Sequence, residues 1–207
     1  MIEGRPTLFD AIEFDEQLAS IDILYDLAFL LMDLWMRGHK PHANIVLNRY
    51  LAGECGRDGN IAGLAALPLF LSCRAGVRAM VMLDRLAHIA DAQMEKALAE
   101  LKAYFDLARS FLEPPPPRLI AAGGLSGTGK STLAGALAPF AGAAPGALWL
   151  RSDVERKEMF GTRIDEPLSE AAYTPQVTRR VYDILNEKAR NALEAGQSVI
   201  LDAVFSK

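Results

Sequence analysis

The sequence predicts an α/β domain with a parallel sheet over residues 118–207, preceded by a mostly α-helical segment. A glycine-rich stretch, residues 124–131, indicates the α/β domain because it lies between a short apolar run and an Ala/Leu-rich run. Two later apolar runs each lead into an aspartate, as strands of a ligand-binding parallel sheet do. Upstream, apolar residues recur at helical spacing, and four consecutive prolines separate that part from the rest.

Composition indicates a globular protein of one or two domains. Of the 207 residues, 51% are hydrophobic and 23% are charged, which is enough to bury a core. The net charge of −4 argues against a general nucleic-acid binder. Cys55 and Cys73 lie far apart without metal-ligand spacing, so we expect reduced thiols in a cytoplasmic protein. The longest apolar run, residues 61–73, is too short to span a membrane, suits a buried helix and gives no reason to expect a membrane partner.

The first 112 residues are predicted to be mostly helical. Residues 6–14 are apolar and aromatic enough to start as an extended strand. A helix from residue 21 to Gly38 follows from apolar residues at i, i+3, i+4 and i+7. Further helices are expected at about 41–52, 61–90 and 91–111, with Pro68 bending or delaying the start of the third. The three histidines, His39, His42 and His88, show no metal-ligand spacing and are expected to be surface or capping residues.

Residues 113–117, Glu-Pro-Pro-Pro-Pro, mark the expected boundary between the two parts. Four prolines end the preceding helix and form a stiff polyproline II spacer. The alternative is a proline-rich motif that binds a partner, but the run is short and lies directly before a strand.

The stretch from Gly124 to Ser131 reads G-x-x-x-x-G-K-S, the pattern of a phosphate-binding loop between a strand and a helix. Glycines leave the backbone N–H groups free to surround a polyphosphate. Lys130 can reach the β- and γ-phosphates, and the Ser131 hydroxyl can hold Mg²⁺. The nucleotide site is predicted to comprise Gly124, Ser126, Gly127, Thr128, Gly129, Lys130, Ser131 and Thr132. The alternative is a glycine-rich turn that binds nothing.

A second strand, predicted at residues 147–151, leads into Asp153 and Arg156. Because the carboxyl ends of parallel strands face the ligand crevice, Asp153 can orient or deprotonate an acceptor hydroxyl. Arg156 lies one helical turn further on, and its planar fork suits a phosphate or carboxylate. The alternative is a helix-capping aspartate and a solvated arginine.

The remaining elements complete the predicted domain. Residues 158–175 are expected to be irregular, and a helix is expected at about 176–195 with Gly196 as its cap. An apolar strand within residues 198–205 then leads into Asp202, in the manner of a carboxylate that organises Mg²⁺. The alternative for Asp202 is a turn residue at the end of the strand.

These motifs resemble the phosphate-loop small-molecule kinases, a group that includes gluconate kinase, zeta-toxin-like kinases and the kinase half of polynucleotide kinases. The matching residues are the loop at 124–131, Ser-Asp-x-x-Arg at 152–156 and Val-Ile-Leu-Asp at 199–202. The resemblance implies a phosphate-loop nucleotide-hydrolase-type fold. It also implies an acceptor-activating role for Asp153 and an acceptor-binding role for Arg156.

Residues 5–110 resemble the C-terminal lobe of aminoglycoside phosphotransferase-like kinases, through Leu8-Phe9-Asp10 and the Asp26-Leu-Ala element. This resemblance implies that Asp10 is a Mg²⁺ ligand and that Asp26 braces a catalytic loop; the alternative for Asp10 is a turn aspartate. The catalytic loop of that family has no counterpart in the sequence, so this segment is expected to be inactive. Together the two parts resemble bacterial bifunctional aminoglycoside phosphotransferase/ATP-binding proteins. The chain is then expected to be an internal piece that stops before an arginine-bearing lid.

The sequence therefore predicts an ATP- and Mg²⁺-dependent phosphotransferase acting on a hydroxyl of a small molecule. Its catalytic residues would be Lys130, Asp153 and Arg156, and its metal residues Ser131, Asp202 and Asp10. Two alternatives remain: an acceptor-independent nucleotide hydrolase or switch, and a non-catalytic scaffold. The identity of the acceptor and the oligomeric state stay open.

Overall fold

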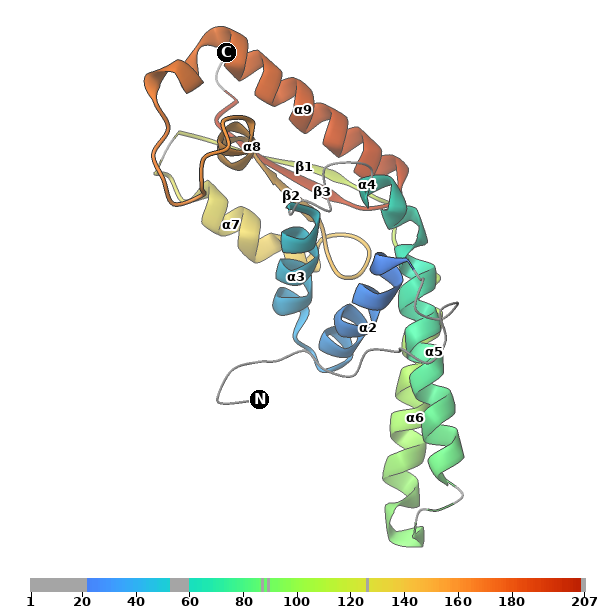
Figure 1. Cartoon of the computed structure of the whole chain (residues 1–207). Coiled ribbons are helices and arrows are strands. Elements are labelled where there is room, and N and C mark those ends of the chain that lie inside the picture. Colours follow the sequence, from blue (N-terminus) through green and yellow to red (C-terminus); the bar gives the residue numbers. More distant parts are fainter. Residues whose placement is uncertain (1–21, 53–59, 87, 89, 126, 206–207) are drawn as a thin grey trace.

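A computed structural model describes residues 22–52, 60–86, 88, 90–125 and 127–205. Its helical part contains α2 (Ile23–Met36), α3 (Lys40–Ala52), α4 (Asn60–Gly63), the 3₁₀ turn η2 (Leu64–Ala66), α5 (Leu67–Leu86) and α6 (Asp91–Phe111). The α/β part then runs through β1 (Leu119–Gly123), α7 (Lys130–Leu137), η3 (Ala138–Phe140), β2 (Leu148–Arg151), α8 (Ser152–Met159), η4 (Glu170–Tyr173), α9 (Pro175–Glu194) and β3 (Val199–Ala203). The predicted order, a helical segment followed by a parallel α/β domain, is confirmed (Figure 1).

Local sequence signals explain where α2 begins and ends. The Asp22 carboxylate accepts a hydrogen bond from the Leu24 N–H at 2.8 Å, which caps the first turn. The buried positions follow at helical spacing: Leu24, Ala28, Leu31 and Met32. Gly38 then turns the chain at φ +78, a conformation that favours glycine.

Pro68 does not bend a single long helix but helps to start one. The expected helix at 61–90 is divided into α4, η2 and α5, and Pro68 occupies the second position of α5, where its missing N–H would have no partner. Residues of α5 are buried only along one stripe: Leu67, Leu71, Ala75 and Ala79. The expectation of a buried helix is therefore correct for this stripe alone.

The long helices α5 and α6 pack as an antiparallel hairpin that projects from the rest of the molecule (Figure 1). Within the described residues, Ile61–Leu86 is long and apolar enough by length and composition to cross a membrane, and 28% of its most apolar window is buried. Two arginines of α5 face α2, where the Arg74 guanidinium lies 4.0 Å from the Tyr25 ring and that of Arg78 lies 4.7 Å from the Phe29 ring. These contacts tie the base of the hairpin to the helical segment.

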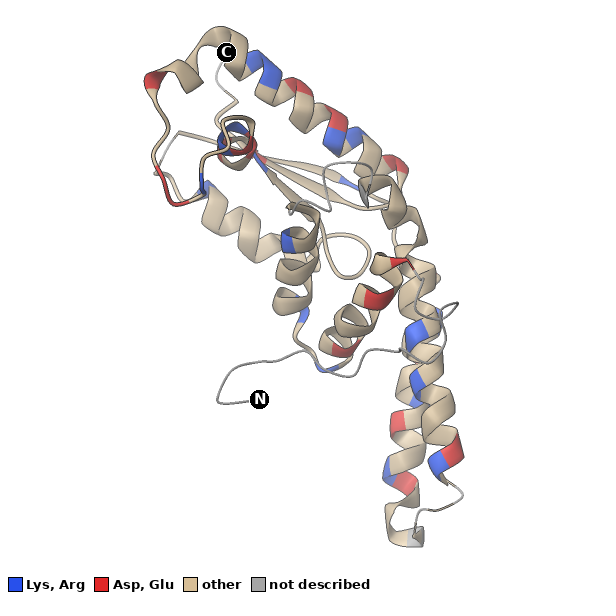
Figure 2. Cartoon of the chain, viewed as in Figure 1, with Lys and Arg blue, Asp and Glu red and all other residues tan. Residues whose placement is uncertain are grey.

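The three described strands form a parallel sheet in the order β1-β3-β2. Alternating residues point to opposite faces, so each face has its own core. Ile120, Trp149 and Ile200 face α7, while α9 packs on the other face (Figure 1). The opposite face buries Leu148, Leu150, Val199 and Leu201. Charged residues of both signs line the outer side of α9 (Figure 2), as expected for a helix with one buried stripe.

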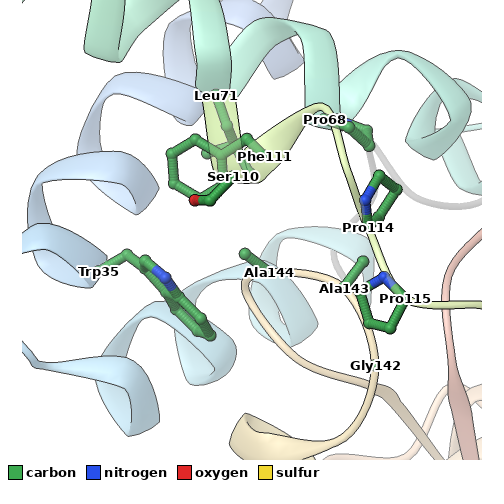
Figure 3. Close-up of a pocket in the computed structure, with 10 residues that line it drawn as sticks. All are labelled: Trp35, Pro68, Leu71, Ser110, Phe111, Pro114, Pro115, Gly142, Ala143 and Ala144. Carbon is green, nitrogen blue, oxygen red and sulfur yellow. The ribbon is translucent and has the colours of Figure 1, made fainter. Parts of the chain in front are cut away.

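One hydrophobic core joins the helical segment to the α/β part. The cluster that contains Leu148 and Leu201 also contains Leu31 of α2, Leu47 of α3 and Leu71 of α5. The proline linker lies along this junction: Pro114 and Pro115 line a pocket of 160 Å³ together with Trp35, Phe111 and the loop residues at 142–144 (Figure 3). The proposed division into two domains at residues 113–117 stays a prediction, and it has to accommodate this shared core.

Candidate nucleotide site

The loop that precedes α7 has the backbone geometry of a phosphate cradle. Gly124, Gly127 and Gly129 have φ values of +148, +81 and +82, which side chains rarely permit. A Cβ added at Gly127 or Gly129 would meet nothing within 4 Å, so the loop faces open space at both positions. The Thr128 hydroxyl donates to the Leu125 carbonyl at 2.8 Å and closes the turn. Backbone N–H groups in such a turn can surround an anion.

Helix α7 starts at the end of this loop and carries the two side chains expected to contact phosphate. Gly129 is its N-cap residue, so Lys130 and Ser131 occupy the first turn, where helical N–H groups lack partners. The Lys130 Nζ donates to the Leu125 carbonyl at 3.3 Å and thus lies back over the loop. Among the described residues this carbonyl oxygen is the hydrogen-bond partner of the ammonium, and a phosphate oxygen can replace it with a stronger, charge-assisted bond.

Asp202 and Arg151 face each other across the ends of two neighbouring strands. They are register partners in β3 and β2 and point to the α7 side of the sheet, two residues beyond Ile200 and Trp149. The Arg151 Nε lies 3.8 Å from the Asp202 Oδ2, and both atoms are buried without a hydrogen-bond partner among the described residues. The Asp202 side chain is only 3% exposed. A buried carboxylate oxygen without a donor is costly in a closed protein, and this one borders a cavity.

Asp153 and Arg156 belong to α8, which begins directly after β2. Arg151 is the N-cap residue of α8, so Asp153 lies in the first turn rather than capping the helix. Its carboxylate is half exposed and lies 3.7 Å from the Lys157 Nζ. Arg156 is only 8% exposed, in contrast to the alternative of a solvated arginine. Its Nη1 donates to the Ala172 carbonyl at 2.6 Å and to the Thr178 hydroxyl at 3.3 Å.

A single cavity of 590 Å³ brings these groups together. Gly127, Lys130 and Ser131 line one side, Asp202 and Arg151 lie at the strand ends, and Asp153 and Arg156 line the other side. The other described residues that line it are Ser152, Tyr173, Thr178, Tyr182 and Val204. Cationic and anionic side chains therefore border one space that is large enough for a phosphate chain and a small acceptor.

Below this cavity, a buried ion pair joins α8 to α9. The Lys188 ammonium donates to both carboxylate oxygens of Glu155, at 2.6 and 2.8 Å. Burial raises the pKa of Glu155 above its ordinary value of 4.5, and the hydrogen bonds from Lys188 oppose that increase. This pair fixes the helix that carries Asp153 and Arg156.

Several predicted residues lie elsewhere or outside the described residues. Asp10, Ser126 and Cys55 fall outside the part of the chain that the structure describes. Gly124, Thr128, Gly129 and Thr132 shape or flank the loop and do not line the cavity. Asp26 lies on α2 with its side chain 76% exposed, and its described contact is the Arg74 guanidinium, 3.5 Å away.

Arg151 and Tyr173 are two of the lining residues that were not predicted from the sequence. Arg151 had a readable signal, since it is a charged residue at the end of a buried strand, two positions after Trp149 on the same face. Tyr173 had no such signal. It reaches the cavity because its segment folds back over α8, where its ring lies 5.1 Å from the Arg156 guanidinium.

Comparison with known proteins agrees with this geometry. Residues 119–207 match the protein family described as "AAA domain", a class of phosphate-loop domain that implies nucleotide binding. Curated relatives include "Uncharacterized protein Rv2004c" of Mycobacterium tuberculosis (strain ATCC 25618 / H37Rv) and "Uncharacterized protein Mb2027c" of Mycobacterium bovis. Each is 33% identical over 208 residues, covering 99% of this chain. The chain spans 40% of the length of these relatives. No solved structure was found to match it.

The residues present fit a nucleotide with Mg²⁺. Among the described residues, no group of three or more His, Cys, Asp or Glu side chains could hold a metal by itself. Mg²⁺ seldom needs such a cage, because it keeps several waters and binds through one or two protein oxygens plus phosphate. The Ser131 hydroxyl and the Asp202 Oδ2 could serve as those protein ligands, because both residues line the cavity beside the cradle.

Proposed function

We propose that the chain is the nucleotide-binding part of an ATP-dependent phosphotransferase that acts on a hydroxyl group of a small molecule. The observation that carries this proposal is the single cavity that joins Lys130 and Ser131 to Asp153 and Arg156. A nucleotide hydrolase needs only the first pair. The second pair, on the opposite side of the same space, suits an acceptor. We place this activity in the cytoplasm, where ATP is abundant.

Each residue has a role that follows from its position. Backbone N–H groups of the loop and the Lys130 ammonium would bind the β- and γ-phosphates of ATP. Ser131 and Asp202 would hold Mg²⁺, which neutralises charge on the phosphates when it is bound. Asp153 would accept the proton of the acceptor hydroxyl and orient its oxygen toward the γ-phosphorus. Catalysis would come mainly from positioning and charge stabilisation.

Arg156 would bind an anionic or polar group of the acceptor. Its Nη1 is already engaged by Ala172 and Thr178, which fix the guanidinium plane. The hydrogen bonds described for Arg156 all come from Nη1, and the side chain lines the cavity. A guanidinium held in place by one nitrogen can use its other N–H groups to bind a phosphate or carboxylate at little cost in side-chain entropy.

The test is ATP turnover with and without a panel of phosphorylatable small molecules. We expect acceptor-dependent turnover to fall by about 10²–10⁴-fold in Asp153→Asn, which keeps the side-chain shape but cannot accept the proton. Nucleotide binding should be unchanged in that variant, because Asp153 lies on the opposite side of the cavity from the loop. Hydrolysis that needs no acceptor and survives Asp153→Asn would favour a nucleotide hydrolase or switch instead.

Lys130→Ala tests the nucleotide site itself. We expect MgATP binding to be lost or to weaken by at least about tenfold, because the ammonium provides the side-chain positive charge on the loop side of the cavity. Lys102→Ala, on the solvent side of α6, is a matched control that should bind as the wild type does. Undiminished binding by a folded Lys130→Ala variant would show that the loop is not a phosphate site.

A further inference from the structure

Strand β2 ends the described sheet, yet its outer edge is not open. In a parallel sheet, alternate peptide groups of an edge strand lack a neighbour, and here these belong to Ala147, Trp149 and Arg151. The inner groups are paired with β3, as shown by the Leu148 N–H that donates to the Ser198 carbonyl at 2.8 Å. One end of helix α3 contacts this edge where β2 begins (Figure 1).

The side-chain amide of Asn48 takes the place of the missing strand. Its Oδ1 accepts from the Trp149 N–H at 2.7 Å, and its Nδ2 donates to the Ala147 carbonyl at 3.3 Å. The backbone N–H and C=O of one residue in a neighbouring parallel strand would make the same two bonds. Asn44, one turn earlier and only 3% exposed, adds a second bond to the Ala147 carbonyl at 2.9 Å. The buried amide of Asn44 and the partly buried amide of Asn48 thus form hydrogen bonds that specify one position of α3 on the strand.

Trp149, whose backbone Asn48 holds, contacts both halves of the phosphate site. On one side, a Cβ added at Gly135 of α7 would lie 3.0 Å from the indole ring, so the helix that carries Lys130 and Ser131 rests directly on this ring. On the other side, the Arg151 guanidinium lies 4.9 Å from the ring centroid, and Arg151 faces Asp202. Lys130, Ser131, Arg151 and Asp202 all line the cavity.

We infer that Asn48 is a positioning residue of the nucleotide site, acting from the helical segment through Trp149. The Asn48 amide fixes the position of the Trp149 backbone relative to α3. The indole ring of Trp149 in turn fixes the positions of α7 and of the Arg151 side chain. The helical segment would then contribute to nucleotide affinity, although its described residues do not line the cavity. This inference rests on the nucleotide-binding part of the proposed function and is independent of the acceptor.

The test measures binding of a fluorescent N-methylanthraniloyl analogue of ADP with Mg²⁺ by anisotropy. We expect Asn48→Leu, which removes both edge bonds, to weaken binding about threefold to tenfold. Arg49→Leu introduces the same residue at the next, exposed position of α3 and should bind as the wild type does. Circular dichroism and a melting curve establish that each variant is folded at the assay temperature.

Two further variants separate positioning from a purely structural role. Asn48→Asp keeps the acceptor for the Trp149 N–H, so it should retain slow hydrogen exchange at that amide and most of the affinity. Asn48→Leu should exchange about tenfold faster there. In a Trp149→Phe background the smaller ring no longer fills the space against Gly135, so the effect of Asn48→Leu on affinity should disappear.

Several outcomes would overturn the inference. A folded Asn48→Leu variant with wild-type affinity would do so, as would an affinity loss that persists unchanged in Trp149→Phe. The proposed function fails separately: a wild type that binds the analogue, and whose ATP hydrolysis no acceptor stimulates and Asp153→Asn does not reduce, would refute the transferase and leave the role of Asn48 standing. A wild type that does not bind the analogue would refute both.

Discussion

At the scale of single residues, the unpaired oxygen of Asp202 is the clearest mark of a ligand site. Within the part of the chain that the structure describes, its Oδ2 and the Arg151 Nε are buried without hydrogen-bond partners, and 3.8 Å is too long for a hydrogen bond between them. Each atom would gain a partner if an ion or phosphate oxygen entered the cavity. Burial of these two polar atoms without hydrogen bonds costs free energy in the unliganded protein, and ligand binding can remove that cost.

Asp202→Asn tests this interpretation. An amide of the same shape has no net charge, so we expect Mg²⁺ to enhance nucleotide binding less in the variant than in the wild type. Binding measured in EDTA should be unchanged, because the loop and Lys130 remain. Nucleotide titrations with Mg²⁺ and in EDTA measure the two affinities for each protein. An equal loss under the two conditions would mean that Asp202 does not act through the metal.

Glu155 makes a pH-dependent contribution to stability whose sign follows from its burial. Burial raises the pKa of its carboxyl in the folded protein above the ordinary 4.5. The stabilising contribution is therefore full below pH 4.5 and is lost as the pH rises through the folded-state pKa. Glu155→Gln carries no titrating group, so the fall in unfolding free energy with rising pH should be shallower in this variant. Urea denaturation at a series of pH values from 4.5 to 7 measures the difference. Identical slopes would show that Lys188 compensates fully for the burial.

At the scale of elements, the loop between η3 and β2 packs closely against the backbone of η3 at Gly146. Gly146 has φ +104, and a Cβ there would collide with the Ala138 carbonyl and lie 2.7 Å from the Pro139 Cα. Gly161 has a comparable φ of +61 but nothing within 4 Å of an added Cβ. Substitution of Gly161 therefore tests the positive φ alone, and substitution of Gly146 tests the positive φ together with steric contact.

Gly146→Ala and Gly161→Ala form a matched pair. The strained backbone alone should cost about 1–2 kcal/mol of unfolding free energy in Gly161→Ala. Gly146→Ala should lose a further 1–3 kcal/mol or so, since the backbone atoms it meets cannot turn away as a side chain would. Chemical denaturation of the two variants and the wild type checks this order. Equal losses would contradict the close packing of the loop against η3.

The elements that the sequence predicted best are those with strong local signals. Helix α6 and the strands before the loop and before Asp202 have a clear period or a clear turn, and the loop itself is defined by its glycines. Pro68 was harder to interpret, because a proline is compatible with either a kink within a helix or the first turn of a new one. The choice depends on the packing of Leu64 and Leu67, which no local pattern encodes.

The sequence predicted the site residues that follow the loop at regular spacing, but not those that tertiary packing brings to the cavity. Spacing from the loop located Asp153, Arg156 and Asp202, because each follows a strand that had to end at the same edge of the sheet. Tyr173 and Tyr182 reach the cavity from a segment and a helix whose placement is tertiary. The contact of Asn48 with Trp149 joins residues 101 apart in the sequence, and a polar residue on a helix gives no hint of a strand edge as its partner.

At the scale of the whole molecule, the shared core implies that the described residues unfold together. Leu31, Leu47 and Leu71 of the helical segment lie in the same cluster as Leu148 and Leu201 of the sheet. We therefore expect a single cooperative transition in urea, with far-ultraviolet circular dichroism, dominated by helices, coinciding with Trp149 fluorescence in a Trp35→Phe background. Two separated transitions would instead show that the proline linker divides two independent domains.

The order of strands in the sheet has a consequence for how the protein is made. The central strand, β3, is the last of the three in sequence, and both β1 and β2 pair with it and not with each other. While the chain emerges from the ribosome, the glycine-rich loop and Asp153 are already synthesised but have no common strand to align them. Until Val199–Ala203 has left the exit tunnel, the nascent chain exposes two unpaired strands and a loop without its opposing carboxylate. A polypeptide stopped at Gln197 would contain every phosphate-loop residue and still be unable to assemble the cavity around them.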